Sequence, residues 1–163
     1  MDTDKALHSL VSAIDYPMFV VTVAAGDQRS GCLVGFVTQG SIEPVRLVVM
    51  ISKANHTCAV ASRATQMVVH FLHRGNLGLA RLFGEQTGDV VDKFSGCSWR
   101  RVAGVEAPVL VGTRGWAAGP VVSRFDAGDH IGHLVDVTAS EVDGEGPQLG
   151  FQMVSSMRPG HPA

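Results

Sequence analysis

The sequence predicts a predominantly antiparallel β fold, a barrel with short helical inserts. At least six segments carry the β-branched and aromatic residues typical of strands, and every helical segment is short. Successive strand segments are joined by turns more often than by helices. Turns can join antiparallel strands, whereas a doubly wound parallel sheet needs a helical crossover at each step. These observations favour a barrel over a parallel sheet.

The first part of the chain is expected to hold two helices and three strands. Apolar residues at helical spacing after an acidic start predict a helix over residues 2–15. Strands at 18–25 and 32–38 flank a turn rich in Gly and polar residues, so they form a hairpin. A third strand at 45–51 ends in a cluster of small polar residues, and a short helix follows over 55–65.

The second part of the chain is expected to be richer in strands. A fourth strand is predicted over 66–73, and a short helix with an apolar face over 76–84. Residues 85–101 are polar and irregular in pattern. Residues 109–142 are strand-like again, and the tail over 157–163 is predicted as a loop.

Length and composition bound the class of protein. The 163 residues contain no repeat or linker, so we expect a single domain over residues 1–163. A formal net charge of −2 with scattered Lys and Arg indicates no nucleic-acid partner. No apolar run reaches the ~18 residues that span a membrane, and the N-terminus lacks the features of a secretion signal. Three widely spaced cysteines are not a disulfide framework, so we expect a reduced, cytoplasmic protein.

Two pairs of histidines have a spacing that metal sites use, His70 with His73 and His130 with His133. Both pairs lie in predicted strands, where side chains three positions apart face opposite sides of the sheet. We therefore expect no metal site. The sequence also lacks the glycine patterns of a Rossmann dinucleotide site or a P-loop, and no nucleophile elbow frames any serine.

The most informative motifs are a series of stretches between Tyr16 and Val137: YPMFVVTV (16–23), GCLVGFVTQGSIEPV (31–45), VVHFLHRGNLGLARLFG (68–84), DKFSGCSW (92–99), GVEAPVL (104–110) and DAGDHIGHLVDV (126–137). In order and spacing they resemble the flavin reductase-like family, small NAD(P)H:flavin oxidoreductases with an FMN-binding split barrel. The resemblance implies an antiparallel split β-barrel with short helical inserts. It also implies FMN or FAD as cofactor, NADH or NADPH as hydride donor, a homodimer, and a two-component monooxygenase as partner.

A phosphate site is suggested by the polar cluster after the third strand. Helix N-termini present unpaired N–H groups to anions, and Thr57 lies near the start of the short helix. The local sequence alone favours a simpler interpretation, in which Thr57 is an ordinary N-cap and Lys53 a solvated charge. The resemblance favours a cradle for the FMN phosphate, built from Gly40, Ser41, Ser52, Lys53, Asn55 and Thr57, with Lys93 nearby.

The resemblance also places residues around the flavin ring. It implies a ring pocket containing Val34, Gly35, Gln39, His70, Leu72, Phe83 and Phe94. His130, in the G-D-H stretch, is the candidate catalytic residue, positioned to serve the flavin or the nicotinamide.

Several positions depart from the family pattern. Gly35 replaces the Asn or Ser that faces the ring, so any contact there must come from the backbone. Leu33, Gln39, Val45 and His70 also differ from the family's residues. These departures leave a deazaflavin open as the ligand.

Two functions follow as expectations. The first is an NAD(P)H-dependent flavin reductase, in which the cofactors carry the chemistry and no strong acid or base is needed. The second is a flavin- or deazaflavin-binding electron carrier or sensor of the same fold, or a haem-binding relative, without efficient NAD(P)H turnover.

Overall fold

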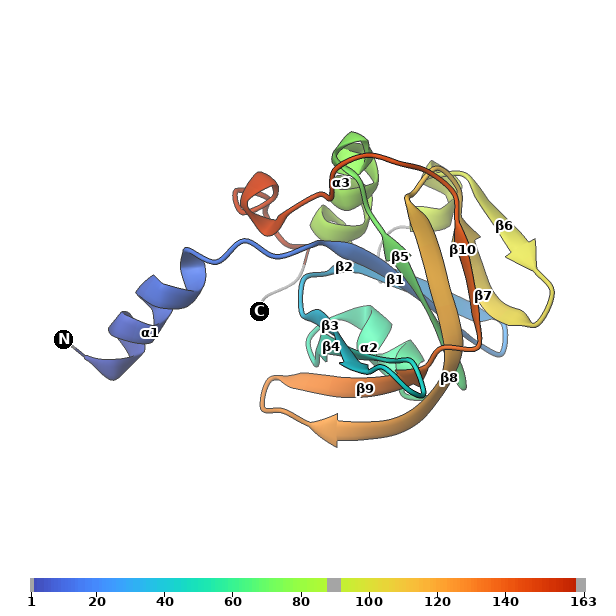
Figure 1. The fold of residues 1–163 in the computed structure, drawn as a ribbon, viewed down its shortest axis with the longest axis horizontal. Coiled ribbons are helices and arrows are strands. Elements are labelled where there is room, and N and C mark those ends of the chain that lie inside the picture. Colours follow the sequence, from blue (N-terminus) through green and yellow to red (C-terminus); the bar gives the residue numbers. More distant parts are fainter. Residues whose placement is uncertain (1, 88–91, 161–163) are drawn as a thin grey trace.

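Figure 1 shows the computed structural model, which describes residues 2–87 and 92–160. Within these residues an eight-stranded antiparallel sheet curls into a split barrel, in the order β2-β1-β5-β8-β9-β4-β3 with β10 paired to β8; β6 and β7 form a separate pair. The predicted fold class is confirmed. The strands are β1 (Phe19–Ala25), β2 (Gln28–Val34), β3 (Val37–Ser41), β4 (Arg46–Ser52), β5 (Gln66–Phe71), β6 (Trp99–Val102), β7 (Val105–Leu110), β8 (Gly115–Asp126), β9 (His130–Asp136) and β10 (Ala139–Val142).

The helices of the described residues are short, as predicted. They are α1 (Thr3–Ser12), α2 (His56–Ala61) and α3 (Leu77–Glu85), with single 3₁₀ turns η1 (Arg74–Asn76), η2 (Lys93–Gly96) and η3 (Phe151–Met153). None of the helices in this part of the chain is both long and apolar enough to cross a membrane. Parts of the predicted irregular segment (88–91) and of the predicted tail (161–163) lie outside the described residues, as does Met1.

The segment predicted as one strand over 32–38 is two strands in the structure. β2 ends at Val34 and β3 begins at Val37, and these two strands lie at opposite ends of the sheet order. Gly35 and Phe36 therefore join the two edges of the curled sheet, and the split of the barrel lies at this link. The hairpin of β1 and β2 is confirmed, but its turn is only Gly26 and Asp27, since Ala25 already pairs with Gln28.

The strand β6 was missed by the sequence prediction, which treated residues 85–101 as irregular. It is four residues long and carries two adjacent arginines, so its pattern is weak. Its anchor is Trp99, whose ring lies 4.7 Å from the Arg29 guanidinium and 5.7 Å from that of Arg101. Cation–π contacts of this kind fix a short edge strand that has little apolar surface.

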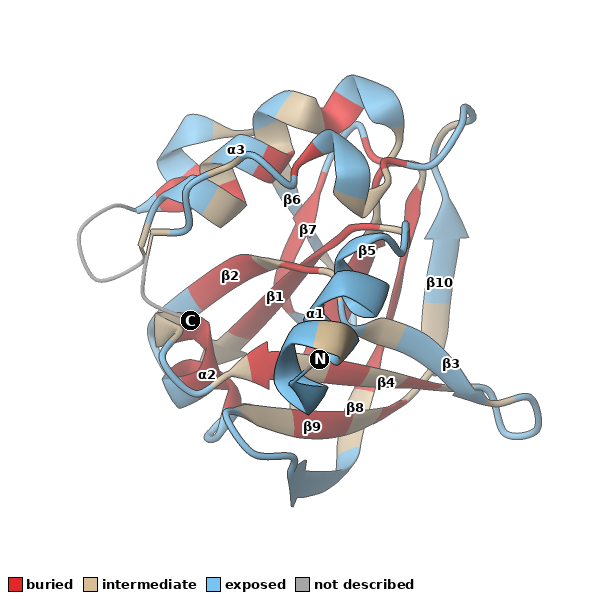
Figure 2. Ribbon diagram, turned by 90° about the vertical axis from the view of Figure 1, so that its left-hand side faces the viewer, coloured by how far each residue is buried: buried red, intermediate tan, exposed pale blue. Residues whose placement is uncertain are grey.

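The core lies mainly inside the curl of the sheet, where β1, β5 and the first half of β8 are buried (Figure 2). His70, on β5, is fully buried there: its Nδ1 lies 2.9 Å from the Val20 carbonyl, and its Nε2 accepts from the Leu110 N–H at 2.9 Å. The ring thus ties β5 to β1 and β7 as a neutral side chain with its proton on Nδ1. Placing His70 in the flavin pocket was wrong, because both of its nitrogens are used inside the core.

We predict a stability that depends on His70 in mildly acidic solution. Burial lowers the pKa of His70 to about 4, whereas an unfolded histidine titrates near 6.5. Between these values the unfolded chain binds the extra proton, so the free energy of unfolding falls as the pH falls. The loss should reach about 3 kcal/mol by pH 4.

Urea unfolding at pH 7, 6, 5 and 4.5 measures this effect. His70→Gln keeps an acceptor for Leu110 but cannot titrate, so its stability should be lower at pH 7 and should fall less steeply with pH. Burial also lowers the pKa of His133, so the variant retains part of the slope. Parallel curves for wild type and variant would rule out His70 as the source.

Candidate functional site

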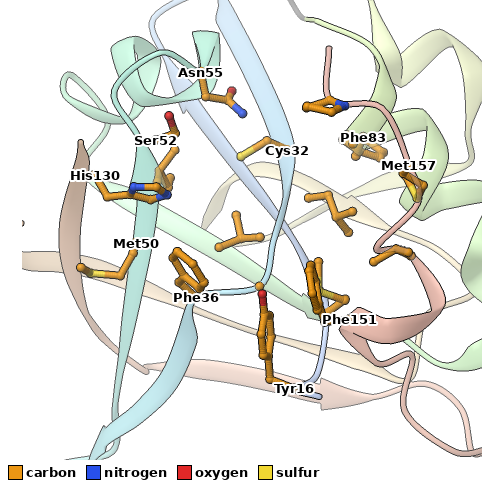
Figure 3. A pocket seen from close by; sticks show the side chains of 18 of the residues that line it. Tyr16, Cys32, Phe36, Met50, Ser52, Asn55, Phe83, His130, Phe151 and Met157 are labelled. Carbon is orange, nitrogen blue, oxygen red and sulfur yellow. The ribbon is translucent and has the colours of Figure 1, made fainter. Parts of the chain in front are cut away.

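A pocket opens at the split of the barrel, beside the Gly35–Phe36 link. Its cavity volume is about 320 Å³. Its walls come from the end of β2, the end of β4, the start of β9, the helix α3 and the C-terminal segment (Figure 3). Of the residues predicted for the site, the structure brings together Val34, Gly35, Ser52, Asn55, Phe83 and His130.

His130 begins β9 and is held by its neighbour in the chain. Its Nδ1 lies 2.6 Å from the Asp129 carboxylate, and its ring is 5.3 Å from that of Phe36. The His130 side chain is 23% exposed, so a ligand in the pocket can reach it. Because the carboxylate accepts from Nδ1, Nε2 is the nitrogen left to face a ligand. The hydrogen bond and charge of His130 hold the pKa of Asp129 below its usual range.

The turn before His130 is braced by polar contacts. Lys53 donates from its Nζ to the Asp126 carboxylate at 2.8 Å and from its backbone to the Asp129 carbonyl at 2.9 Å. The Gly128 N–H donates to the other Asp126 oxygen at 2.9 Å, and Gly128 has a φ of 114° that favours glycine. These contacts fix the backbone of the turn that carries Asp129, whose carboxylate bonds His130.

An aromatic row forms one wall of the pocket. Phe151 stacks on Tyr16 with ring centroids 4.7 Å apart. The Tyr16 ring lies 6.0 Å from that of Phe36, and the Phe36 ring in turn contacts the His130 ring. Sequence reasoning missed Tyr16, Phe36 and the C-terminal wall with Phe151 and Met157. Phe36 falls within the strand predicted over 32–38, and Phe151 and its neighbours lie in residues 143–156, to which no element was assigned, so the local pattern gave no signal for this wall.

Gly35 has a different role from the one expected. A Cβ at this position would lie 2.4 Å from the Tyr16 ring. The glycine therefore makes room for Tyr16, and the space that a larger side chain would occupy belongs to the pocket wall.

The predicted phosphate cradle is not assembled around Thr57. Its hydroxyl is buried and bonded to the Ser30 hydroxyl at 2.8 Å. The N-cap of α2 is Asn55, whose side-chain oxygen accepts from the Thr57 N–H at 2.9 Å. Lys53 is engaged by Asp126, as described above. Only Ser52 and Asn55 of this cluster line the pocket.

Three further cradle and ring residues lie elsewhere. Ser41 pairs with Arg46 at one end of β4, whereas Ser52 is at the other end. Six residue steps along a strand separate the two ends by about 20 Å, so Gly40 and Ser41 cannot share a phosphate with Ser52. Gln39 lines a second cavity on the other side of Tyr16.

Three more predicted cofactor contacts are core residues. Leu72 and Phe94 are buried, and Phe94 packs edge-on against Phe83. Lys93 is only 4% exposed, and its Nζ donates to the carbonyls of Gly31 and Phe83 at 3.0 Å each. Burial lowers the pKa of the Lys93 ammonium. Its charge supports the β2–α3 contact and is not available to a phosphate.

The lining of the pocket suits a flat, largely apolar ring system with a polar edge. The walls are aromatic and aliphatic, and the polar side chains Ser52, Asn55 and His130 lie on one side. Ligand pockets of about 300–1,000 Å³ with few, well-placed polar groups are typical of cofactor sites. Among the described residues that line it, none is Lys or Arg. The residues fit the ring of a flavin better than its phosphate.

No cluster suited to a metal ion occurs among the described residues. His70 lies in the core, and His73 caps η1 by accepting from the Gly75 N–H at 3.0 Å. His133 is buried, with its Nδ1 3.2 Å from the Val49 carbonyl, while His130 faces the pocket. The two histidines of each pair thus point to different places.

The split barrel and its pocket define a flavin-type barrel, and comparison with known proteins gives its family. The flavin reductase like domain matches residues 11–156. The chain therefore belongs to the flavin reductase-like family, a class of flavin oxidoreductases. A diflavin flavoprotein of Synechocystis sp. is 28% identical over 130 residues, which cover 79% of this chain. The chain spans about a fifth of that relative's length, 22%.

Solved structures share the fold over most of the chain. A flavin reductase domain protein from Arthrobacter sp. FB24 has a TM-score of 0.84 and 20% identity, covering 98% of this chain and 96% of its own. The NADH:FAD oxidoreductase SgcE6 from Streptomyces globisporus has a TM-score of 0.79 and 20% identity, covering 86% and 83%. These likenesses establish the shared split-barrel architecture.

We predict that Lys93 serves stability and not ligand binding. Lys93→Met removes the donor to two buried carbonyls and should lower the free energy of unfolding by about 2–4 kcal/mol. Flavin affinity of the folded variant should stay within about twofold of wild type. Urea unfolding and fluorescence titration with FMN measure the two quantities.

Lys53→Met is the matched control, because the same change there removes an exposed pair with Asp126. Exposed pairs contribute about 0–1 kcal/mol, so this variant should keep its stability. A Lys93→Met protein of normal stability with weak FMN binding would restore the phosphate role.

Proposed function

We propose that the protein is an NAD(P)H-dependent flavin reductase that uses FMN or FAD. The observation that carries this proposal is the Asp129–His130 pair at the polar edge of a largely apolar pocket. The pocket offers a planar ligand an aromatic wall, and His130 is the side chain with a fixed proton position beside it. Membership of the flavin reductase-like family and the NADH:FAD oxidoreductase activity of SgcE6 support the choice of substrates.

A bound flavin would supply the chemistry, since its ring accepts a hydride from the reduced nicotinamide. The protein's own part is positioning and solvent exclusion. Tyr16, Phe36 and Phe151 form a wall against which a ring can lie. Asp129 keeps the proton of His130 on Nδ1, which leaves Nε2 to accept a hydrogen bond, or to donate one when the imidazole is protonated. Val34 and Phe83 keep water from the inner end.

The phosphate end would be recognised by Ser52 and Asn55 at the pocket and by groups beyond it. No cation lines the described pocket, so the ring contributes most of the affinity. The proposal therefore predicts similar binding of riboflavin and FMN. Isolation of the bound ligand, followed by anaerobic titration with NADH and with NADPH, identifies flavin and donor together. A two-component monooxygenase as the acceptor of reduced flavin, and a cytoplasmic location, belong to the same proposal.

A second candidate is a flavin or deazaflavin carrier or sensor without efficient NAD(P)H turnover. The observation that favours it is the small cavity, about 320 Å³, which is near the lower limit for ligand pockets of about 300–1,000 Å³ and suits one ring system more readily than two. The titration above separates the candidates. Slow bleaching by both nucleotides, with tight flavin binding, favours the carrier.

We also propose a homodimer, as the family resemblance implies. The described residues include a set of exposed large apolar side chains, among them Leu10, Ile42 and Val142. A dimer interface would cover part of this exposed apolar surface. Light scattering at micromolar concentration should give about twice the 17.2 kDa of one chain. A mass equal to one chain contradicts the dimer.

We predict that His130→Ala slows flavin reduction without unfolding the protein. The side chain is partly exposed and bonded only to Asp129 among the described residues, so the melting temperature should change little. Losing one positioned hydrogen bond in the transition state should reduce the rate by about 10- to 100-fold. Flavin affinity should fall only slightly.

Stopped-flow bleaching of the protein-bound flavin measures the rate. His73→Ala provides a matched control, because that histidine lies outside the pocket. A wild-type rate together with a sharply lower melting temperature for His130→Ala would make His130 a structural residue.

A further inference from the structure

The helix α1 stands away from the rest of the molecule (Figure 1). None of its residues is buried. Its apolar side chains lie on one face, continued by Ile14, and they are widely exposed: Leu7 58%, Leu10 70%, Val11 46% and Ile14 51%. A helix of this length is marginal in water on its own, and an apolar stripe of this kind normally packs against a core. We therefore expect this apolar face of α1 to pack against another protein surface.

Hydrogen bonds to Gln152 hold the C-terminal end of α1 and fix the direction in which the helix projects. The Gln152 side-chain amide donates to the carbonyls of Ser12 at 3.0 Å and Ile14 at 3.1 Å. The Gln152 backbone N–H donates to the Asp15 carboxylate at 3.0 Å, and Tyr16 stacks on Phe151. While these contacts hold, α1 cannot turn back onto its own barrel.

An apolar groove lies beside this base. It has a volume of about 930 Å³, and Tyr16 and Pro17 form one end of it. The groove runs between β3, β4, β5, β8 and β10, and its floor contains Phe19, Leu47, Phe71, Ala117 and Val137. Its rim includes Val45, 47% exposed, and Val142, 86% exposed. In Figure 2, α1 projects toward the viewer, while β3 and β10, which border the groove, lie on the right-hand side of the molecule.

The charges of the helix and the groove are complementary. Arg114 lines the groove and has no carboxylate partner within residues 2–87 and 92–160. The other charged groove residue, Glu141, is already paired with Arg100 at 2.9 Å. Asp4, in the first turn of α1, is exposed. A helix that enters the groove brings an acidic end to a groove with one unpaired cation.

We propose that α1 of one copy of this chain docks its apolar face in the groove of a second copy, and that the second copy returns the same contact. One chain carries both a helix that cannot reach its own groove and a groove of matching polarity that begins at Tyr16 and Pro17, next to the base of the helix. A two-fold dimer satisfies both at once, because an isologous interface uses the same two surfaces twice. The inference rests on the dimer proposed above and assigns its contacts.

Two variants test the contact from its two sides. Leu7→Glu/Leu10→Glu charges the helix face, and Val45→Glu charges the groove rim. All three positions are exposed in the single chain, so both variants should fold, as circular dichroism checks. Sedimentation equilibrium should show that each raises the dimer dissociation constant at least 100-fold, since each dimer loses two apolar contacts.

Matched controls carry the same change away from the contact. Ser9→Glu lies on the opposite face of α1, and Val122→Glu is an equally exposed valine of β8 outside the groove. Both should remain dimeric with dissociation constants within about threefold of wild type.

A mixture distinguishes exchange between copies from other contacts of the helix. The helix variant has an intact groove, and the groove variant has an intact helix. Their mixture should form heterodimers with one complete contact, and the dimer fraction should exceed that of either variant alone. A mixture no more dimeric than its components overturns the proposal and assigns α1 to another partner.

The remaining outcomes separate this inference from the dimer itself. A monomeric wild type contradicts both. A dimeric wild type whose dissociation constant is unchanged by either variant retains the dimer and overturns the helix exchange. Flavin titration of each variant tests the proposed function separately, because its result does not depend on whether the dimer forms.

Discussion

The two-residue link between β2 and β3 is the constraint on which this fold depends. Seven strands in the order β2-β1-β5-β8-β9-β4-β3 would place the edges of a flat sheet about 29 Å apart. The chain from Val34 to Val37 spans at most about 11 Å. The sheet must therefore curl until its edges nearly meet, and Gly35 and Phe36 lie where they do.

The same constraint creates the pocket. Bringing the edges together sets the end of β2 opposite the end of β4 and the start of β9, so Ser52 and His130, which pair across these strands, face the link. Two buried ionisable side chains, Lys93 and His70, stabilise this arrangement from inside the protein. Lys93 joins β2 to α3 through two carbonyls, and His70 joins β5 to β1 and β7. The polar groups inside hold the strands together, and Ser52, Asn55 and His130 at the split line the pocket.

Much of the fold could be predicted from the sequence, because periodicity and turn residues report local structure. The β1–β2 hairpin and α3 are examples. The break at Gly35 could not, since Phe36 and Val37 continue a strand-like pattern while the reversal of partner is set by the whole sheet. The site residues divide in the same way. Ser52 and His130 could be predicted, because they lie at strand ends that the local pattern reveals. The burial of Lys93 could not, because nothing in the local sequence shows that its ammonium donates to two buried carbonyls.

The Tyr16 ring fills the space that a side chain at position 35 would otherwise occupy. A Cβ at position 35 would lie 2.4 Å from the Tyr16 ring, and Tyr16 borders both the pocket at the split and the groove. Restoring the larger side chain that the family resemblance implies at 35 thus requires a smaller one at 16. For protein engineering the two positions are therefore a compensating pair, to be exchanged together, and the residue chosen at 16 would set how the pocket at the split is separated from the groove.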